Sequence, residues 1–116
     1  MADRIVLTIP TAHGYRAVAS LVLGGIGSRL ELPFERMDDV QLAVLSLLDS
    51  ASEDTVTLEV DAQPEAFAVA IGPLQEGVGG DRSLANVLDR LVESTEELRR
   101  DGRSWLRLQL SLAPSS

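Results

Sequence analysis

Acidic side chains in the middle of the chain are the first residues that could do chemistry. Glu35, Asp38 and Asp39 stand close together, and paired carboxylates can transfer protons or bind a divalent ion. They open a stretch with helical periodicity, in which adjacent residues point about 100° apart. Acids at such a position stabilise the helix dipole, so we interpret them as helix-start residues without a catalytic role.

A glycine-rich stretch is the second candidate. Gly77-Val78-Gly79-Gly80 precedes a predicted helix, where backbone amides could hold a phosphate. No Lys followed by Ser or Thr completes a phosphate-binding loop, so a flexible connector is the alternative. His13 stands alone and the chain has no cysteine, which excludes thiol nucleophiles and zinc ribbons. We expect no metal site.

Length and charge limit the remaining classes. The 116 residues, with a net charge of -8, predict one domain over residues 1–113 and a disordered tail over 114–116. The acidic surface disfavours nucleic acid and anionic membranes. Neither a membrane-length apolar run nor a signal-peptide pattern occurs at the start of the sequence. We therefore expect a cytoplasmic protein.

The elements that must position any site are organised around a predicted helix from about Phe34 to Ser50. Its apolar residues recur every three or four positions, at Val40, Ala43, Val44, Leu47, Leu48 and Ala51, which indicates one buried face. Around it the patterns predict strands at 4–10, 55–60, 66–71 and 104–112, and helices ending near 30 and 100. Glu93, Glu96 and Glu97 would form the wet side of the last helix. The fold class is α+β: a two-layer sandwich with a mainly antiparallel four-stranded sheet and three helices on one face.

Two features suggest packing or binding surfaces. Gly24, Gly25 and Gly27 lie within the first predicted helix, where they favour close helix packing. In the last strand, Trp105 and Arg107 alternate with inward leucines and should point to the other face. We expect them to anchor an interface, although a tryptophan shielded by its neighbours is the alternative.

The run Phe34-Glu35-Arg36-Met37-Asp38-Asp39-Val40-Gln41-Leu42-Ala43-Val44, after an opening strand ending in Ile-Pro and a helix with Gly-Ile-Gly-Ser, resembles bacterial anti-sigma-factor serine kinases. These belong to the superfamily of histidine-kinase, gyrase and heat-shock-protein ATPase domains. The resemblance covers nearly the whole chain in element order. It implies a truncated histidine-kinase-like ATPase fold.

The resemblance also implies that the ATP-binding boxes are degenerate. The family's catalytic Glu and magnesium-binding Asn fall at Ser46 and Ser50, and a hydroxyl is a poor substitute for either. Gly72 follows the hairpin without the family's adenine-binding Asp. Gly79 and Gly80 lie near its last glycine box. Ser50, Gly72, Gly79 and Gly80 would then be the remnants of a cofactor site, with no catalytic residue.

The sequence therefore predicts a non-catalytic regulatory protein that resembles an anti-sigma factor, binds a sigma factor or an anti-anti-sigma-like protein, and needs no cofactor. We also expect a homodimer formed through the first strand and the first helix, which carries Tyr15. One alternative is an active serine kinase using ATP and Mg²⁺ with unorthodox residues. Another is a subunit whose active site is completed by a second chain.

Overall fold

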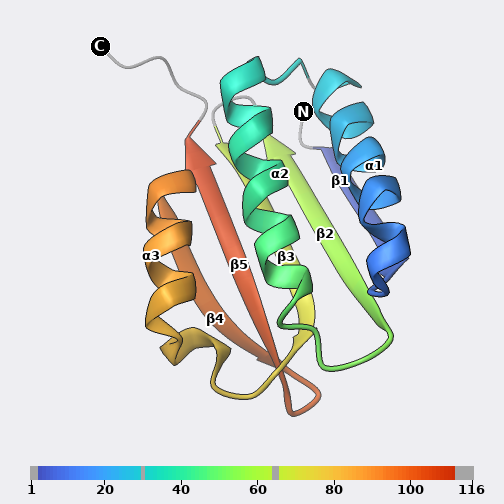
Figure 1. Ribbon diagram of the computed structural model, residues 1–116. Coiled ribbons are helices and arrows are strands. Elements are labelled where there is room, and N and C mark those ends of the chain that lie inside the picture. Colours follow the sequence, from blue (N-terminus) through green and yellow to red (C-terminus); the bar gives the residue numbers. More distant parts are fainter. Residues whose placement is uncertain (1–2, 30, 64–65, 112–116) are drawn as a thin grey trace.

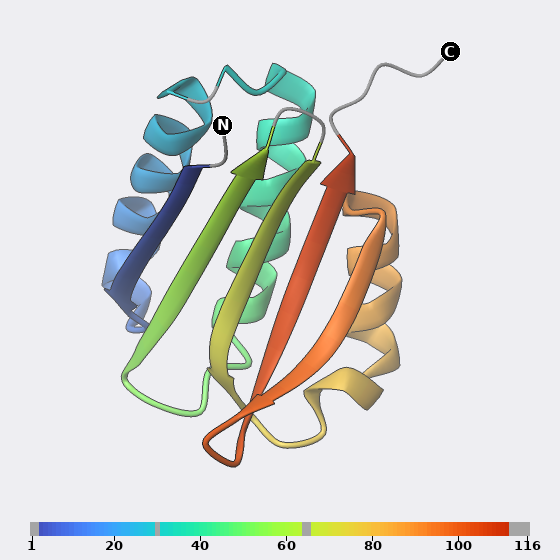
Figure 2. The ribbon, with the colours of Figure 1, turned by 180° about the vertical axis from the view of Figure 1, so that it is seen from behind.

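A computed structural model describes residues 3–29, 31–63 and 66–111 of the chain. Its described strands form a single antiparallel sheet in the order β1-β2-β3-β5-β4. Three α-helices cover one face (Figure 1), and the view from behind shows no described element over the other (Figure 2). The elements are β1 (Asp3–Pro10), η1 (His13–Tyr15), α1 (Arg16–Arg29), α2 (Phe34–Leu48), β2 (Thr55–Gln63), β3 (Ala66–Leu74), η2 (Val78–Gly80), α3 (Arg82–Leu91), β4 (Ser94–Arg100) and β5 (Arg103–Ser111).

The core lies between α2 and the middle of the sheet, as the apolar stripe predicts. Figure 1 shows α2 between α1 and α3, in front of the central strands. Val40, Val44 and Leu47 are fully buried and join one cluster with the alternating apolar residues of the strands, such as Phe67 and Leu108. The α+β class with three helices on one face is confirmed. The helix ends at Leu48, two residues before the predicted end.

The prediction of four strands is wrong, because the described residues form five. The last helix ends at Leu91, and residues predicted to continue it form β4 beside β5. A two-residue turn with positive φ at Asp101 and Gly102 joins these strands, the geometry that tight hairpins require. Glu96 and Glu97 therefore lie on an edge strand, and Glu93 lies in the connection before it.

Close packing of the first two helices is confirmed at two of the three glycines. A side chain at Gly27 would overlap the Met37 sulfur, and one at Gly24 would approach Gln41 Nε2 at 3.2 Å. The Gln41 side chain instead donates to the Ser20 carbonyl across this contact, at 3.1 Å. A Cβ at Gly25 would meet nothing within 4 Å, so this glycine is not needed for the packing.

Two further findings bear on the predictions. Leu112 and the predicted tail over 114–116 lie outside the described residues. Over residues 3–29, 31–63 and 66–111, the helices are too short or too polar to cross a lipid bilayer.

Candidate functional site

Ser46 and Ser50 lie at the carboxyl end of α2, where the resemblance would require an acid and an amide. The Ser46 hydroxyl donates to the Leu42 carbonyl of its own helix at 2.8 Å, a bond that uses its proton locally. Ser50 follows the helix end, and its carbonyl accepts from the Gln75 backbone amide at 2.7 Å. Ser50 therefore ties α2 to the segment that follows β3.

A small hollow beside Ser50 is lined by Ser50, Gln75, Glu76, Gly77, Val78 and Asp81. Its volume is about 100 Å³. Ligand pockets are typically about 300 to 1,000 Å³. The hollow is therefore well below the size of a pocket for a nucleoside triphosphate.

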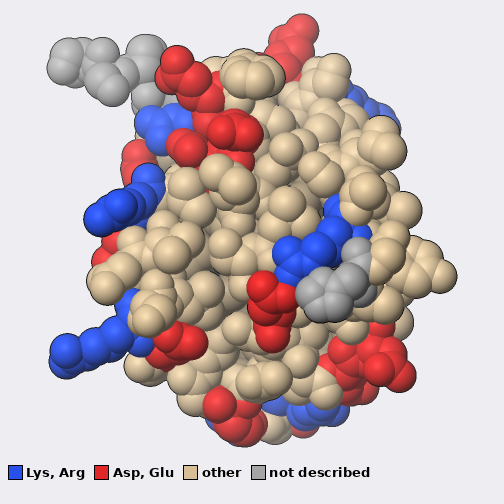
Figure 3. All heavy atoms as spheres, in the orientation of Figure 1, with Lys and Arg blue, Asp and Glu red and all other residues tan. Residues whose placement is uncertain are grey.

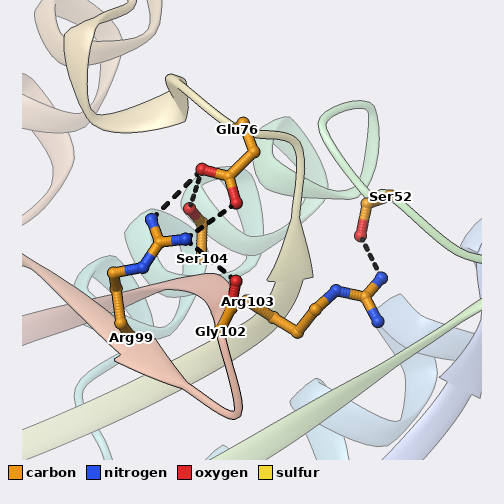
Figure 4. Close-up of polar contacts among 6 residues, drawn as sticks. All are labelled: Ser52, Glu76, Arg99, Gly102, Arg103 and Ser104. Carbon is orange, nitrogen blue, oxygen red and sulfur yellow. Dashed lines mark hydrogen bonds and ion pairs between the residues drawn. The ribbon is translucent and has the colours of Figure 1, made fainter.

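The two carboxylates at this hollow both make structural contacts. The Asp81 side chain accepts from the Leu84 amide at 3.1 Å and caps α3. Figure 4 shows that the Glu76 carboxylate accepts two bonds from Arg99, at 3.0 and 3.1 Å, and one from the buried Ser104 hydroxyl at 3.3 Å. The hydrogen bond and charge of Arg99 hold the pKa of Glu76 below its ordinary value. The contacts of Glu76 with Arg99 and Ser104 hold the segment after β3 against the β4–β5 hairpin.

The structure separates the predicted cofactor-binding residues. Gly79 and Gly80 lie in η2 next to Val78, which lines the hollow. The Glu97 carboxylate of β4 lies against Gly79, where an added side chain would have to displace it. Gly72 lies on the opposite face of the sheet, against the Trp105 ring. Among the described residues, no group of three or more His, Cys, Asp or Glu is arranged to hold a metal ion.

The helix-free face of the sheet carries Trp105 and Arg107, as predicted. The Trp105 ring covers Gly72, where a Cβ would overlap it. The Arg100 guanidinium lies over the same ring, 4.6 Å from its centroid, a cation–π contact. Trp105 is half-buried, so its neighbours shield it in part, in keeping with the alternative reading.

An ion-pair network crosses this face beside the tryptophan. Glu59 on β2 pairs with Arg100 on β4 at 2.7 Å and with Arg4 on β1 at 3.3 Å. Between these strands, Ala68 and Ala70 of β3 form a buried floor, and Arg107 and Glu96 lie opposite each other on β5 and β4. The result is a shallow charged trough over the short side chains of β3.

Glu59 carries a pH dependence that can be measured. The hydrogen bond from Arg100, with the charges of Arg100 and Arg4, lowers the pKa of Glu59. A lowered folded-state pKa means that the pairing stabilises the fold above the unfolded glutamate pKa, about 4.3, and that this is lost as the pH falls through the folded value. On this water-exposed face the contribution should be about 1 kcal/mol or less.

We therefore expect Glu59→Gln to lower the free energy of unfolding at pH 7 and to have a smaller effect near pH 3, as measured by urea denaturation at both pH values. Glu93→Gln is the matched control, because the described residues give Glu93 no ion-pair partner. An effect of Glu59→Gln that is equal at both pH values would contradict this assignment.

Tyr15 lies on the edge side of the molecule. It ends η1, is half-exposed, and is followed one turn later by the half-exposed Val18. The edge strand β1 and helix α1 lie side by side in both ribbon views (Figures 1 and 2). Trp105 is on β5, which β2 and β3 separate from β1 in the sheet. Tyr15, near the β1 edge, therefore does not belong to the surface around Trp105.

Sequence reasoning missed Glu59, Arg100 and Glu76. Glu59 was visible as the one acid among the outward residues of a strand predicted over 55–60, but its partners lie on β1 and β4. Arg100 falls at the end of the last helix that the sequence pattern predicts. These contacts depend on strand order, which no local pattern reports.

The comparisons with known proteins give no family for this fold. No protein-family model matches the chain. No curated protein matches its sequence significantly. The class defined by the structure is therefore an α+β domain with a five-stranded antiparallel sheet and three helices on one face.

Proposed function

We propose that this chain is a non-catalytic, cytoplasmic regulatory protein that acts by binding another protein, as a degenerate relative of the anti-sigma-factor serine kinases. The proposal depends first on the residues: serine replaces acid and amide at Ser46 and Ser50 of a family-like helix. A sigma factor or an anti-anti-sigma-like protein is the kind of partner that the resemblance implies.

The observation that carries the proposal is the state of the hollow beside Ser50. It is about 100 Å³ in volume, and the carboxylates lining it already cap α3 or bind Arg99. The Ser46 hydroxyl donates to its own helix. A kinase needs a free base to accept the proton of the attacking hydroxyl and oxygen ligands for magnesium. The groups here support neither role.

We expect no binding of ATP with Mg²⁺ tighter than about 100 μM, corresponding to about -5.5 kcal/mol, in isothermal titration calorimetry. An active kinase would both bind ATP with Mg²⁺ and transfer its phosphate to a protein serine. The double variant Ser46→Glu and Ser50→Asn, which restores the family's residue types, should bind ATP no more tightly, because the hollow is about 100 Å³ in volume. A dissociation constant for ATP below about 100 μM, measured with the unaltered chain, would overturn the proposal.

The competing function is an active serine kinase with unorthodox residues. Transfer of labelled phosphate from ATP to a serine of an anti-anti-sigma-like protein would support it. Such a rate should then fall when Ser46 and Asp49 are changed to alanine. A rate unaffected by these changes would point to a contaminating kinase.

We further propose that the chain forms a homodimer through β1 and α1. Three observations support this: β1 is an edge strand of the described sheet, its outward Val6 is exposed, and Tyr15 and Val18 are half-exposed beside it. Unpaired edges next to apolar side chains are sites where a second chain can add.

A further inference from the structure

An apolar groove lies between α1 and α2, away from the hollow beside Ser50 and from the Trp105 face. It is lined by Gly24, Gly27, Ser28, Leu32, Phe34, Met37, Asp38 and Gln41, with a volume of about 360 Å³. This is within the range of about 300 to 1,000 Å³ that binding sites occupy. At Gly24 and Gly27 the Gln41 and Met37 side chains of α2 lie directly against the α1 backbone, so the two helices meet closely beneath the groove.

Phe34 lines this groove, and further large apolar side chains stand exposed on the two helices that form it. Phe34, in the first turn of α2, is 86% exposed, and Leu21 on α1 is 76% exposed. Leu42, two turns after Phe34 on α2, is 47% exposed. Side chains four residues apart share a helix face, so Phe34, Asp38 and Leu42 form one ridge. Exposed apolar side chains beside a groove mark an interaction surface.

The charge around the groove selects its occupant. Asp38 is the charged side chain among the described residues that line the groove, and the exposed Glu31 and Glu35 lie within seven residues of it in the sequence. Figure 3 shows an area without charged side chains over the upper parts of α1 and α2, a basic and an acidic group over their lower ends, and mainly acidic side chains near the top of α2. A second copy would bring these acids against each other. A partner with basic side chains would neutralise them.

We propose that this groove binds a basic amphipathic helix of a partner protein. Its apolar stripe would pack against Phe34, and its Lys or Arg side chains would approach Asp38. This is the helix-in-groove mode of recognition, with anchors repeating at three and four residues. The inference rests on the proposed protein-binding function and names the surface and the chemistry of the partner.

The test uses a synthetic helical peptide of about 18 residues, long enough to be partly helical alone, with a leucine stripe flanked by lysines. A second peptide carries glutamates in place of the lysines. We expect the lysine peptide to bind the full chain and to shift the amide NMR signals of Gly24, Gly27 and Ser28. The glutamate peptide should bind at least about tenfold more weakly.

Matched variants separate the groove from general attraction to an acidic protein. Phe34→Ser and Asp38→Lys should each weaken binding of the lysine peptide about tenfold, as loss of an interface anchor does. Val87→Ser is a comparable apolar-to-polar change and Asp89→Lys is the same acid-to-base change, both at exposed positions on α3, and each should change binding less than about twofold. All four positions are exposed, so the fold should be retained.

Three outcomes would overturn the proposal: no binding of the lysine peptide, equal losses from the α3 variants, or a dimer that Phe34→Ser dissociates in sedimentation. The last would make a second copy the occupant. Failure here is distinguishable from failure of the proposed function, because ATP binding is measured independently. If the chain binds neither ATP nor the peptide, the proposed non-catalytic function stands and the groove is rejected as the binding surface.

Discussion

Leu47→Ala should lower the free energy of unfolding by about 2 to 5 kcal/mol. Leu47 is fully buried on the sheet-facing side of α2 and belongs to the central cluster. Removing its side chain loses the apolar transfer energy and leaves a cavity that close-packed neighbours can only partly fill. Urea denaturation followed by circular dichroism measures the change.

Leu42→Ala is the matched control for this prediction. It makes the same substitution in the same helix, but Leu42 is 47% exposed. Its cost should stay below about 1 kcal/mol, since less apolar surface leaves water on folding. Equal losses from the two variants would mean that α2 does not bury the face described.

Gly27→Ala should destabilise the chain by about 1 to 3 kcal/mol despite the better helix propensity of alanine. The new methyl group would overlap the Met37 sulfur, and Met37 is itself buried under α1. Either Met37 must leave its position or the two helices must separate. Thermal unfolding of the variant measures the loss.

Gly25→Ala should have the opposite sign. It lies two residues away in the same helix, and its Cβ would meet nothing within 4 Å. Alanine should therefore stabilise the chain by about 0.5 to 1 kcal/mol through helix propensity and the unfolded-state entropy. If Gly27→Ala and Gly25→Ala both stabilise the chain, α1 and α2 pack less closely at Gly27 than the structure shows.

Most helices and strands could be predicted because the periodicity of their apolar residues lies within each segment's own sequence. The stripe of α2 and the alternation of β5 both report one buried face, and burial follows them: Val40, Val44 and Leu47 on the helix, Leu106 and Leu108 on the strand. β4 escaped because almost all of it is exposed. An edge strand without a buried face leaves no alternation to read, and its Glu and Leu residues matched a helix as well.

The candidate site was predictable in its residues more than in its geometry. The resemblance points to the serines at 46 and 50, and the alternation of the last strand predicts the outward Trp105. The hydrogen bonds that occupy Glu76 join β4, β5 and the segment after β3, and no local pattern brings those three together. The groove between α1 and α2 also required the structure, although the glycines of α1 indicated close packing.

The sequence by itself determined the helix at the centre, the alternating strands, the acidic surface and the serines at the end of α2. Each of those properties depends on a single segment or on composition, so the spacing and types of its residues are enough to predict it. Only the tertiary structure decided the fifth strand, the pairing of Glu59 with Arg100, the small hollow beside Ser50 and the exposure of Phe34 beside a groove. The physical reason is that these depend on strand order and helix approach, which arise when distant segments pack against one core.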